Sequence, residues 1–306
     1  MKNTAFVFVG SVDGCLTAAA LVNHIGVENY TLHPTQAFTV QETLDSIPDY
    51  SNVWFVDLAV NNRNPDYTKE YMQALLAKGC VVRGIVDEHD AAAWQDLLGG
   101  TTLDTLIVRP VSQKVCPAIN SAGAVLLSQR ICSMYVTELC LSAHLADNGV
   151  FRGVGELVNK AIKSDIKNQL RRAEIVRILS KQGADLSPIM DWAKEYDEIE
   201  RNMKDILAAS YVENGVVIAD SRGKKVDMTS LMFKLYEKAS YCCLKGQAWD
   251  GNQMVNVTSF GTSTGTNMQE ATGMLHAGFG FAKKWNVSDE LASTALANLQ
   301  AYLANQ

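Results

Sequence analysis

The chain has 306 residues, of which 47% are hydrophobic and 20% are charged, and its formal net charge is -6. This length predicts two domains with a substantial core. Its apolar runs are too short to span a bilayer, so we expect no membrane partner. The negative charge argues against long duplex nucleic acid as a partner, because such binding needs a broad basic surface. The net charge does not argue against small anionic substrates.

The N-terminus and the cysteines indicate a cellular location. Residues 1–10 are too short in their apolar part, and too soon followed by Asp13, to form a secretory signal. The seven cysteines form no CxxC pair, and an odd number argues against a disulfide framework. We therefore expect a cytoplasmic protein with reduced cysteines.

The first half alternates strand and helix patterns. Apolar runs bounded by turn residues lie at 5–9, 29–33, 53–58, 81–86 and 104–108, with helix-like segments between most of them. This spacing predicts an α/β fold with a doubly wound parallel sheet. Ligands of such sheets bind at the carboxyl ends of the strands, where Asp13, Asp57 and the group Asp87–Asp90 fall.

The middle of the chain is helical, and strands return after Gly215. Residues 121–147, 157–179 and 189–210 predict helices, with a break at 182–188 in which Asp185 or Ser187 is available as an N-cap. The basic pair Arg171-Arg172 is most simply a solvated helix face. Runs at 215–220, 239–246 and 254–260, with a turn at Asp250-Gly251, predict the strands of a second, smaller α/β domain.

Acidic residues follow several apolar elements. They are Asp13, Asp57, Asp87 with Glu88, and Asp147. Any one of them alone is more simply a helix cap or a turn residue. Together, at one edge of a sheet, they would repel one another unless a cation neutralised them, which indicates a metal site.

Two glycine-containing loops suggest other chemistry, and both patterns are weak. "GTSTG" at 261–265 satisfies the G-x-S-x-G nucleophile pattern, but the only acid between it and His276 is Glu270, too close for a hydrolase triad. The loop could instead offer backbone N–H groups to a phosphate, or be a plain loop. "GSVDG" at 10–14 lacks the third glycine of a dinucleotide-binding turn and places an acid where a pyrophosphate would lie.

The acidic segments, taken with their neighbours, resemble the DHH phosphoesterases that carry a C-terminal DHHA1 domain, a superfamily that includes oligoribonucleases. The resemblance covers almost the whole chain: "SVDGCLTAAAL", "FVDLAV", "IVDEHDAAA", "INSAGAVL" and "HLADNG" are similar to the motifs of the first domain, and "YCCLKGQAWDGNQMVNVTSFG" with "ATGMLHAGFGF" to the second. It implies a DHH-like metal domain at 1–150, a helical connector at 151–210 and a DHHA1-like substrate-binding domain at 211–306.

The resemblance also implies the ligands of a metal ion. One of the two family sites maps onto Asp13, Asp57, Glu88 and Asp147, with a glutamate in place of the first histidine of the D-H-H signature. This all-oxygen set suits Mn²⁺ or Mg²⁺. The other site loses its histidine, and Ser11 replaces its first aspartate, so one site is favoured over two.

Further roles follow from the same resemblance. Asp87 would orient its neighbour, and His89 would contact the scissile phosphate, although His89 alone could equally be a surface turn histidine. Residues at substrate-binding positions of the second domain are His276, Thr258 in place of the family arginine, Ser259 and Gly280.

The expected function is metal-dependent hydrolysis of a phosphodiester or phosphoanhydride bond in a small nucleotide or short oligonucleotide. The partner is then a small phosphorylated substrate or a short single-stranded oligonucleotide. The sequence is also compatible with a homo-oligomer. The alternatives are a catalytically impaired relative that binds a nucleotide or a protein, and a purely structural role.

Overall fold

The chain divides into two compact units, Met1–Glu195 and Tyr196–Gln306. The computed structural model describes residues 3–61, 64–89, 91–98, 111, 116, 118–129, 133–249 and 254–305. The division into 1–150, 151–210 and 211–306 remains a prediction. The helices of its middle part are shared between the units, since α6 to α8 lie in the first and α9 in the second.

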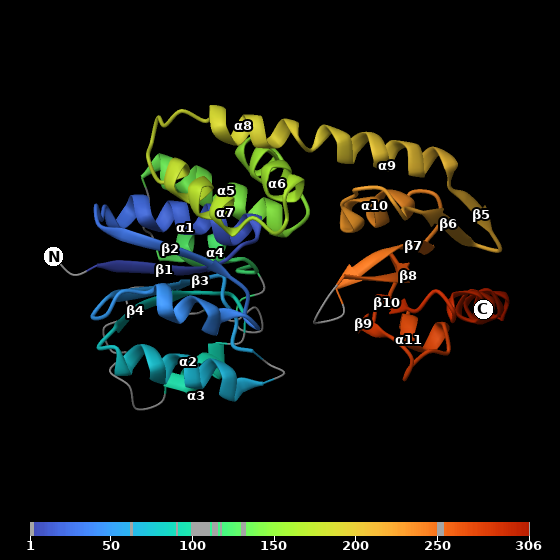
Figure 1. Cartoon of the computed structure of the whole chain (residues 1–306), viewed down its shortest axis with the longest axis horizontal. Coiled ribbons are helices and arrows are strands. Elements are labelled where there is room, and N and C mark those ends of the chain that lie inside the picture. The colour runs from blue at the N-terminus through green and yellow to red at the C-terminus, as the bar shows by residue number, and fades with distance from the viewer. Residues whose placement is uncertain are drawn as a thin grey trace. The chain divides into compact units, whose positions relative to one another are not determined.

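The first unit is built on a four-stranded parallel sheet with the order β2-β1-β3-β4 (Figure 1). Its strands are β1 (Thr4–Val9), β2 (Tyr30–Thr35), β3 (Asn52–Val56) and β4 (Val81–Val86). They correspond to the predicted runs at 5–9, 29–33, 53–58 and 81–86. The predicted strand at 104–108 lies outside the described residues.

Helices cover both faces of this sheet, because alternate side chains of each strand point to opposite faces. In β1, Phe6 and Phe8 pack into one core, whereas Ala5 and Val7 pack into the other. The first core is covered by α1 (Val12–Ile25), α4 (Ala122–Ser128), α5 (Met134–Asp147), α6 (Val154–Ser164), α7 (Gln169–Leu179) and α8 (Ser187–Lys194); the second by η1 (Val40–Ser46), α2 (Pro65–Ala77) and α3 (Ala91–Leu98). The predicted doubly wound α/β architecture is confirmed.

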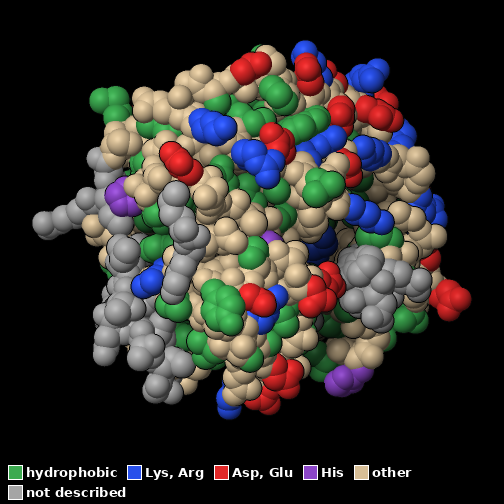
Figure 2. Space-filling view, turned by 60° about the vertical axis from the view of Figure 1, so that its left-hand side comes forward, with side chains coloured by type: hydrophobic (Ala, Val, Ile, Leu, Met, Phe, Trp, Pro, Cys, Tyr) green, Lys and Arg blue, Asp and Glu red, His purple; other side chains and the backbone are tan. Residues whose placement is uncertain are grey.

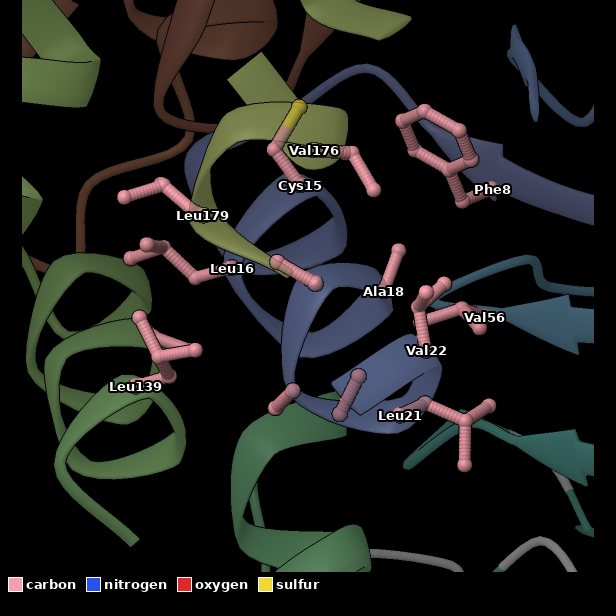
Figure 3. Close-up of a cluster of buried hydrophobic side chains, with 14 of the residues drawn as sticks. Phe8, Cys15, Leu16, Ala18, Leu21, Val22, Val56, Leu139, Val176 and Leu179 are labelled. Atoms are coloured by element: carbon pink, nitrogen blue, oxygen red, sulfur yellow. The ribbon is translucent and has the colours of Figure 1, made fainter. Parts of the chain in front are cut away.

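Helix α1 lies in the middle of the larger core (Figure 3). Ser11 caps its N-terminus by accepting the N–H of Gly14, and the helix ends at Gly26, whose φ of 66° is readily adopted only by glycine. Figure 3 shows α1 side chains between Phe8 and Val56 of the sheet on one side and the neighbouring helices on the other. The helix that begins with the first acidic motif is therefore held on several sides.

The prediction for Arg171 and Arg172 was wrong. Arg172 is buried, and the Arg171 side chain is only 9% exposed. The guanidinium of Arg171 bonds both carboxylate oxygens of Glu195 and lies 5.3 Å from the ring centroid of Trp192. A polar run on a helix predicts a solvated face only where no other helix packs against it, and here α7 is enclosed by its neighbours.

The second unit contains a six-stranded mixed sheet with the order β5-β6-β7-β8-β10-β9. The strands are β5 (Tyr211–Glu213), β6 (Val216–Asp220), β7 (Tyr241–Trp249), β8 (Met254–Thr262), β9 (Phe279–Phe281) and β10 (Lys284–Val287). Helices α9 (Asp197–Ala209) and α10 (Met228–Leu235) cover one face, and α11 (Met268–Ala271) and α12 (Ala292–Ala304) the other. The predicted strands correspond to β6, β7 and β8, whereas the turn at Asp250-Gly251 lies outside the described residues.

The surface mixes both signs of charge. On the face shown in Figure 2, acidic and basic side chains lie interspersed rather than in separate fields. Within the described residues, no helix has the length and apolar character needed to cross a membrane.

Candidate metal centre

Three acidic segments meet at one edge of the parallel sheet. Asp13 lies in the first turn of α1, directly after β1, while Asp57 follows β3 and Asp87 and Glu88 follow β4. Strands β1, β3 and β4 are adjacent and parallel, so their carboxyl ends lie side by side. The topology therefore brings together side chains that are far apart in the sequence.

The carboxylate of Asp13 is buried and already accepts three hydrogen bonds. Oδ1 accepts the Thr17 hydroxyl at 2.9 Å and the Gly123 N–H at 3.1 Å, and Oδ2 accepts the Ala122 N–H at 2.8 Å. The two peptide donors belong to α4, which is capped by Ser121. Since a carboxylate oxygen has two lone pairs, only Oδ2 keeps one for a further ligand.

Burial governs the protonation of Asp13. It raises the pKa of this carboxyl to about 6, although the bonds from Ala122 and Thr17 act to lower it. Uncompensated negative charge in this position is therefore unfavourable, and a cation would relieve it.

Asp57 has an unusual backbone conformation with a φ of 57°, a region that aspartate and asparagine tolerate better than most residues. Its N–H donates to the carbonyl of Val86 at 2.8 Å, and its Oδ2 accepts the Ser11 hydroxyl at 2.7 Å. Burial, followed by the charges of Asp13 and Glu88, raises the pKa of Asp57 well above its ordinary value. The hydroxyl of Ser11 thus holds the carboxylate of Asp57.

Asp87 is fully buried and holds two neighbours. Its Oδ1 lies 2.7 Å from His89 Nδ1, and its Oδ2 accepts the indole N–H of Trp94 at 3.0 Å. The hydrogen bond to Asp87 is the main reason that the pKa of His89 is raised to about 9. The side chain of His89 is half exposed, and its Nδ1 also lies 3.6 Å from Glu88 Oε1.

Glu88 has an oxygen without a partner. Its side chain is only 4% exposed, and among the described residues Oε2 has no hydrogen-bond donor. Burial, followed by the charge of Asp87, raises its pKa to about 7. A buried carboxylate oxygen without a donor is costly, and a metal ion is one way to satisfy it.

The side chains form two groups that share Glu88. Asp13, Glu88 and Asp147 can each present one ligand atom within 4.8 Å of the others, and so can Asp57, Asp87, Glu88 and His89. Asp147 comes from the end of α5 and is exposed. Of the four predicted ligands, Asp13 and Asp57 thus fall in different groups that meet at Glu88.

The donor set fits a divalent cation. It consists almost entirely of carboxylate oxygens, four of the acids have raised pKa values, and one oxygen has no partner among the described residues. Oxygen ligands suit Mg²⁺ or Mn²⁺ better than zinc, whose usual ligands are cysteine and histidine.

The residues predicted to bind substrate in the second unit differ in exposure. Thr258 and Ser259 are fully buried in β8, where their hydroxyls donate to Asp289 at 3.1 Å and Asn286 at 2.6 Å. His276 is exposed, and Gly280 in β9 has a φ of 140°. Their roles remain predictions, and a ligand would meet Thr258 or Ser259 only after displacing one of these internal bonds.

The hydroxyl loop after β8 bonds mainly to itself. Thr264 lies within 2.9 Å of the hydroxyls of both Thr262 and Thr266, and the Tyr241 hydroxyl contacts Thr266 at 2.8 Å. These bonds favour the plain-loop interpretation of "GTSTG" over a nucleophile.

Sequence reasoning missed Trp94. It lies seven residues after Asp87 and one helical turn into α3, and an indole N–H is a donor that can satisfy a buried carboxylate. The sequence shows a tryptophan soon after an aspartate that ends a strand. This predicts a hydrogen bond between them only if the position of α3 beside β4 is known.

Replacing Trp94 with phenylalanine tests this contact. We expect the unfolding free energy to fall by about 1–3 kcal/mol, because Asp87 loses a buried donor. Mn²⁺ affinity should fall with it, since Asp87 and Glu88 are adjacent. Urea denaturation and Mn²⁺ titration measure the two effects. The matched control is Trp285→Phe in the second unit, which also removes a buried indole donor, to the carbonyl of Met274; equal effects of both variants on Mn²⁺ affinity would contradict the prediction.

Comparisons with known proteins identify the fold. No family model and no curated protein matches the chain. Among solved structures, the pGpG-specific phosphodiesterase PggH from Vibrio cholerae is similar with a TM-score of 0.63 and 12% identity, covering 99% of each chain. An exonuclease RecJ bound to manganese has a TM-score of 0.57 and 13% identity, covering 100% of this chain and 91% of that one. RecJ from Thermus thermophilus, with Mn²⁺, has a TM-score of 0.56 and 14% identity, and this chain spans 52% of its length.

The class defined by these matches is the two-domain DHH fold. A structure titled as a DHH domain also matches, with a TM-score of 0.59 and 10% identity over 98% of this chain and 87% of that one. The expected DHH/DHHA1 architecture is therefore confirmed: a parallel sheet in the first unit and a mixed sheet in the second.

Proposed function

We propose that the protein is a DHH-type, metal-dependent phosphoesterase that hydrolyses a phosphodiester or phosphoanhydride bond. The observation that carries the proposal is the set of buried carboxylates that converge on Glu88, whose Oε2 has no donor among the described residues. Similar solved structures include a phosphodiesterase and an exonuclease bound to manganese. The proposed substrate is a small nucleotide or short oligonucleotide, and the proposed location is the cytoplasm.

The metal would be held by Glu88 with Asp13 and Asp147, and Asp57 would complete the set from the other group that shares Glu88. A bound Mn²⁺ or Mg²⁺ supplies Lewis-acid polarisation of a phosphoryl oxygen and lowers the pKa of water. Asp13 offers a single oxygen, Oδ2, because its Oδ1 is filled by two donors. The buried acids and the fold around them keep these ligands in place before the ion arrives.

The proposed role of His89 is to contact the scissile phosphate. Asp87 accepts from Nδ1, which orients the ring and leaves Nε2 for an anion. The raised pKa of His89, due mainly to this bond, keeps the ring protonated near neutral pH. A fixed positive charge beside a transferring phosphoryl group stabilises the negative charge of the transition state.

One ion is favoured over two. In the family the position of Ser11 carries an aspartate ligand, but here Ser11 offers only a hydroxyl, which donates to Asp57 Oδ2. The same hydroxyl accepts the N–H of Gly14 and caps α1, so it acts as a hydrogen-bond donor and as an acceptor within the protein.

Calorimetric titration with Mn²⁺, together with a hydrolysis screen, tests the proposal. We expect a stoichiometry near one and turnover of at least one member of a panel of short oligonucleotides, linear and cyclic dinucleotides, and polyphosphate. Glu88→Gln keeps the shape of the side chain and should abolish both Mn²⁺ binding and hydrolysis. Binding of nucleotides without turnover in the presence of Mn²⁺ would favour the impaired, binding-only relative. No Mn²⁺ binding at millimolar concentration would refute the metal site.

A further inference from the structure

Arg172 on α7 is a buried cation with an unusual set of partners. The residue is 6% exposed. Its guanidinium donates to three backbone carbonyls: Nε to Gly10 at 2.8 Å, Nη1 to Asn168 at 3.1 Å and Nη2 to Ile166 at 2.7 Å. Among the described residues it has no carboxylate within ion-pair distance.

Such an arrangement is expensive to fold. Burial lowers the pKa of Arg172 because it penalises the charged form, and the charge of Asp165, which acts in the opposite direction, offsets this only in part. An apolar side chain of similar volume would leave three carbonyls without this donor. The guanidinium therefore ties the carbonyl of Gly10 to the segment that leads into α7.

The long-range partner of Arg172 is the loop that leads into the metal centre. Gly10 directly precedes Ser11, and the Gly10 N–H donates to the carbonyl of Thr35 at 3.1 Å. Ser11 then caps α1 and donates to Asp57, and Asp13 follows two residues later. The carbonyl of Gly10 is thus fixed by a side chain 162 residues away in the sequence.

The approach between the loop and Arg172 requires the glycine. A Cβ added at Gly10 would lie 2.5 Å from Arg172 Cδ and 2.6 Å from Nε, too close for either atom. The guanidinium has little room to retreat, since its other nitrogens are bonded to the start of α7.

We propose that Arg172 is a positioning residue for the metal centre: by holding the carbonyl of Gly10 it fixes the loop that places Ser11, Asp57 and Asp13. This inference rests on the proposed metal site for its effect on the metal, but the loop can be measured without any ion. The helix that carries Arg172 lies in the proposed connector, so the connector is part of the centre's support and not only a spacer.

Arg172→Gln and the neighbouring Arg171→Gln form a matched pair. Both remove a largely buried guanidinium from α7, but Arg171 bonds Glu195 and Ser164 rather than the loop. We expect both variants to lower the melting temperature. Only Arg172→Gln should accelerate amide hydrogen exchange over residues 10–16 and weaken Mn²⁺ binding, by roughly tenfold, the usual effect of losing a residue that orients metal ligands.

Gly10→Ala tests the same contact from the other side, because it disturbs the approach of Arg172 to Gly10 without removing the guanidinium. It should reproduce the faster exchange and the weaker Mn²⁺ binding, and the double variant should be no worse than the more affected single variant, because both break one contact. The pair Gly10→Ala and wild type also decides the question if Arg172→Gln does not fold.

The outcomes separate the two proposals. A wild-type protein that does not bind Mn²⁺ refutes the metal site, yet faster exchange at 10–16 in Arg172→Gln and Gly10→Ala still supports the positioning role. Exchange over 10–16 that is equal in Arg172→Gln, Arg171→Gln and wild type overturns the positioning role, whatever the metal does.

Discussion

Replacing Asp57 with asparagine is expected to abolish Mn²⁺ binding and hydrolysis while making the metal-free protein more stable. An amide removes one of the negative charges that a cation would neutralise. Burial and the charges of Asp13 and Glu88 disfavour the ionised form of Asp57 and so raise its pKa. A neutral amide avoids both costs. Opposite signs for binding and stability are typical of a site built for a ligand rather than for the fold.

Asparagine is the right substitution because of the backbone. Asp57 has a φ of 57°, which asparagine tolerates and alanine does not. Asparagine also keeps an oxygen that can accept the Ser11 hydroxyl. A loss of binding in Asp57→Asn therefore reports the charge, not a distorted loop.

The measurements are Mn²⁺ calorimetry and urea denaturation in the presence of a chelator. We expect no detectable Mn²⁺ binding and a gain in unfolding free energy, because the folded protein no longer has to bury this charge beside Asp13 and Glu88. Asp191→Asn is the control, since Asp191 is exposed and, within the described ranges, forms an ion pair only with Lys194. It should change the unfolding free energy by less than about 0.5 kcal/mol. Binding in Asp57→Asn at wild-type affinity would remove Asp57 from the ligand set.

The stability of the metal-free protein is expected to fall as the pH rises from about 5 to about 9. Burial raises the pKa of Asp13 to about 6 and, with the charge of Asp87, that of Glu88 to about 7. Between the ordinary and the raised values the folded protein binds more protons than the unfolded chain, so the unfolding free energy decreases with pH. His89 acts in the same direction, because its bond to Asp87 raises its pKa to about 9 and the resulting stabilisation is lost above its ordinary value.

Mn²⁺ should reverse this dependence. The ion binds the ionised carboxylates, so protons compete with it at low pH, and its stabilising effect grows as the pH rises. At a concentration 100 times its dissociation constant it should add about 2.7 kcal/mol. Denaturation curves at several pH values, with chelator and with Mn²⁺, measure both slopes. Metal-free stability that rises between pH 6 and pH 8 would contradict the picture of uncompensated buried acids.

Most of the fold could be predicted because its signals are local. Four strands of the first unit and three of the second appear as apolar runs ended by turn residues, and Asp57, Asp87 and Glu88 follow their strands directly. In a parallel sheet this order alone places them at one edge.

The contacts that were missed depend on packing between distant segments. In "QLRRAEIVRIL" two adjacent arginines look alike, yet one bonds Glu195 and the other the carbonyl of Gly10, far away in the sequence. Likewise, the hydrogen bond from Ser11 to Asp57 joins two segments that are 46 residues apart. The three-dimensional arrangement of these segments also places Asp13 and Asp57 in different groups. Periodicity determines which face a side chain lies on, but not which backbone group it meets.

The hydrogen bonds that α4 donates to Asp13 also affect how long an ion would stay. With the Thr17 hydroxyl, the N–H groups of Ala122 and Gly123 fill three of the four lone-pair positions of the carboxylate, so Asp13 could hold a cation through Oδ2 alone. An ion bound by single oxygens from separate segments would depend on the position of each segment. Under our proposal, a shift of α4 would therefore change the occupancy of the site and with it the turnover.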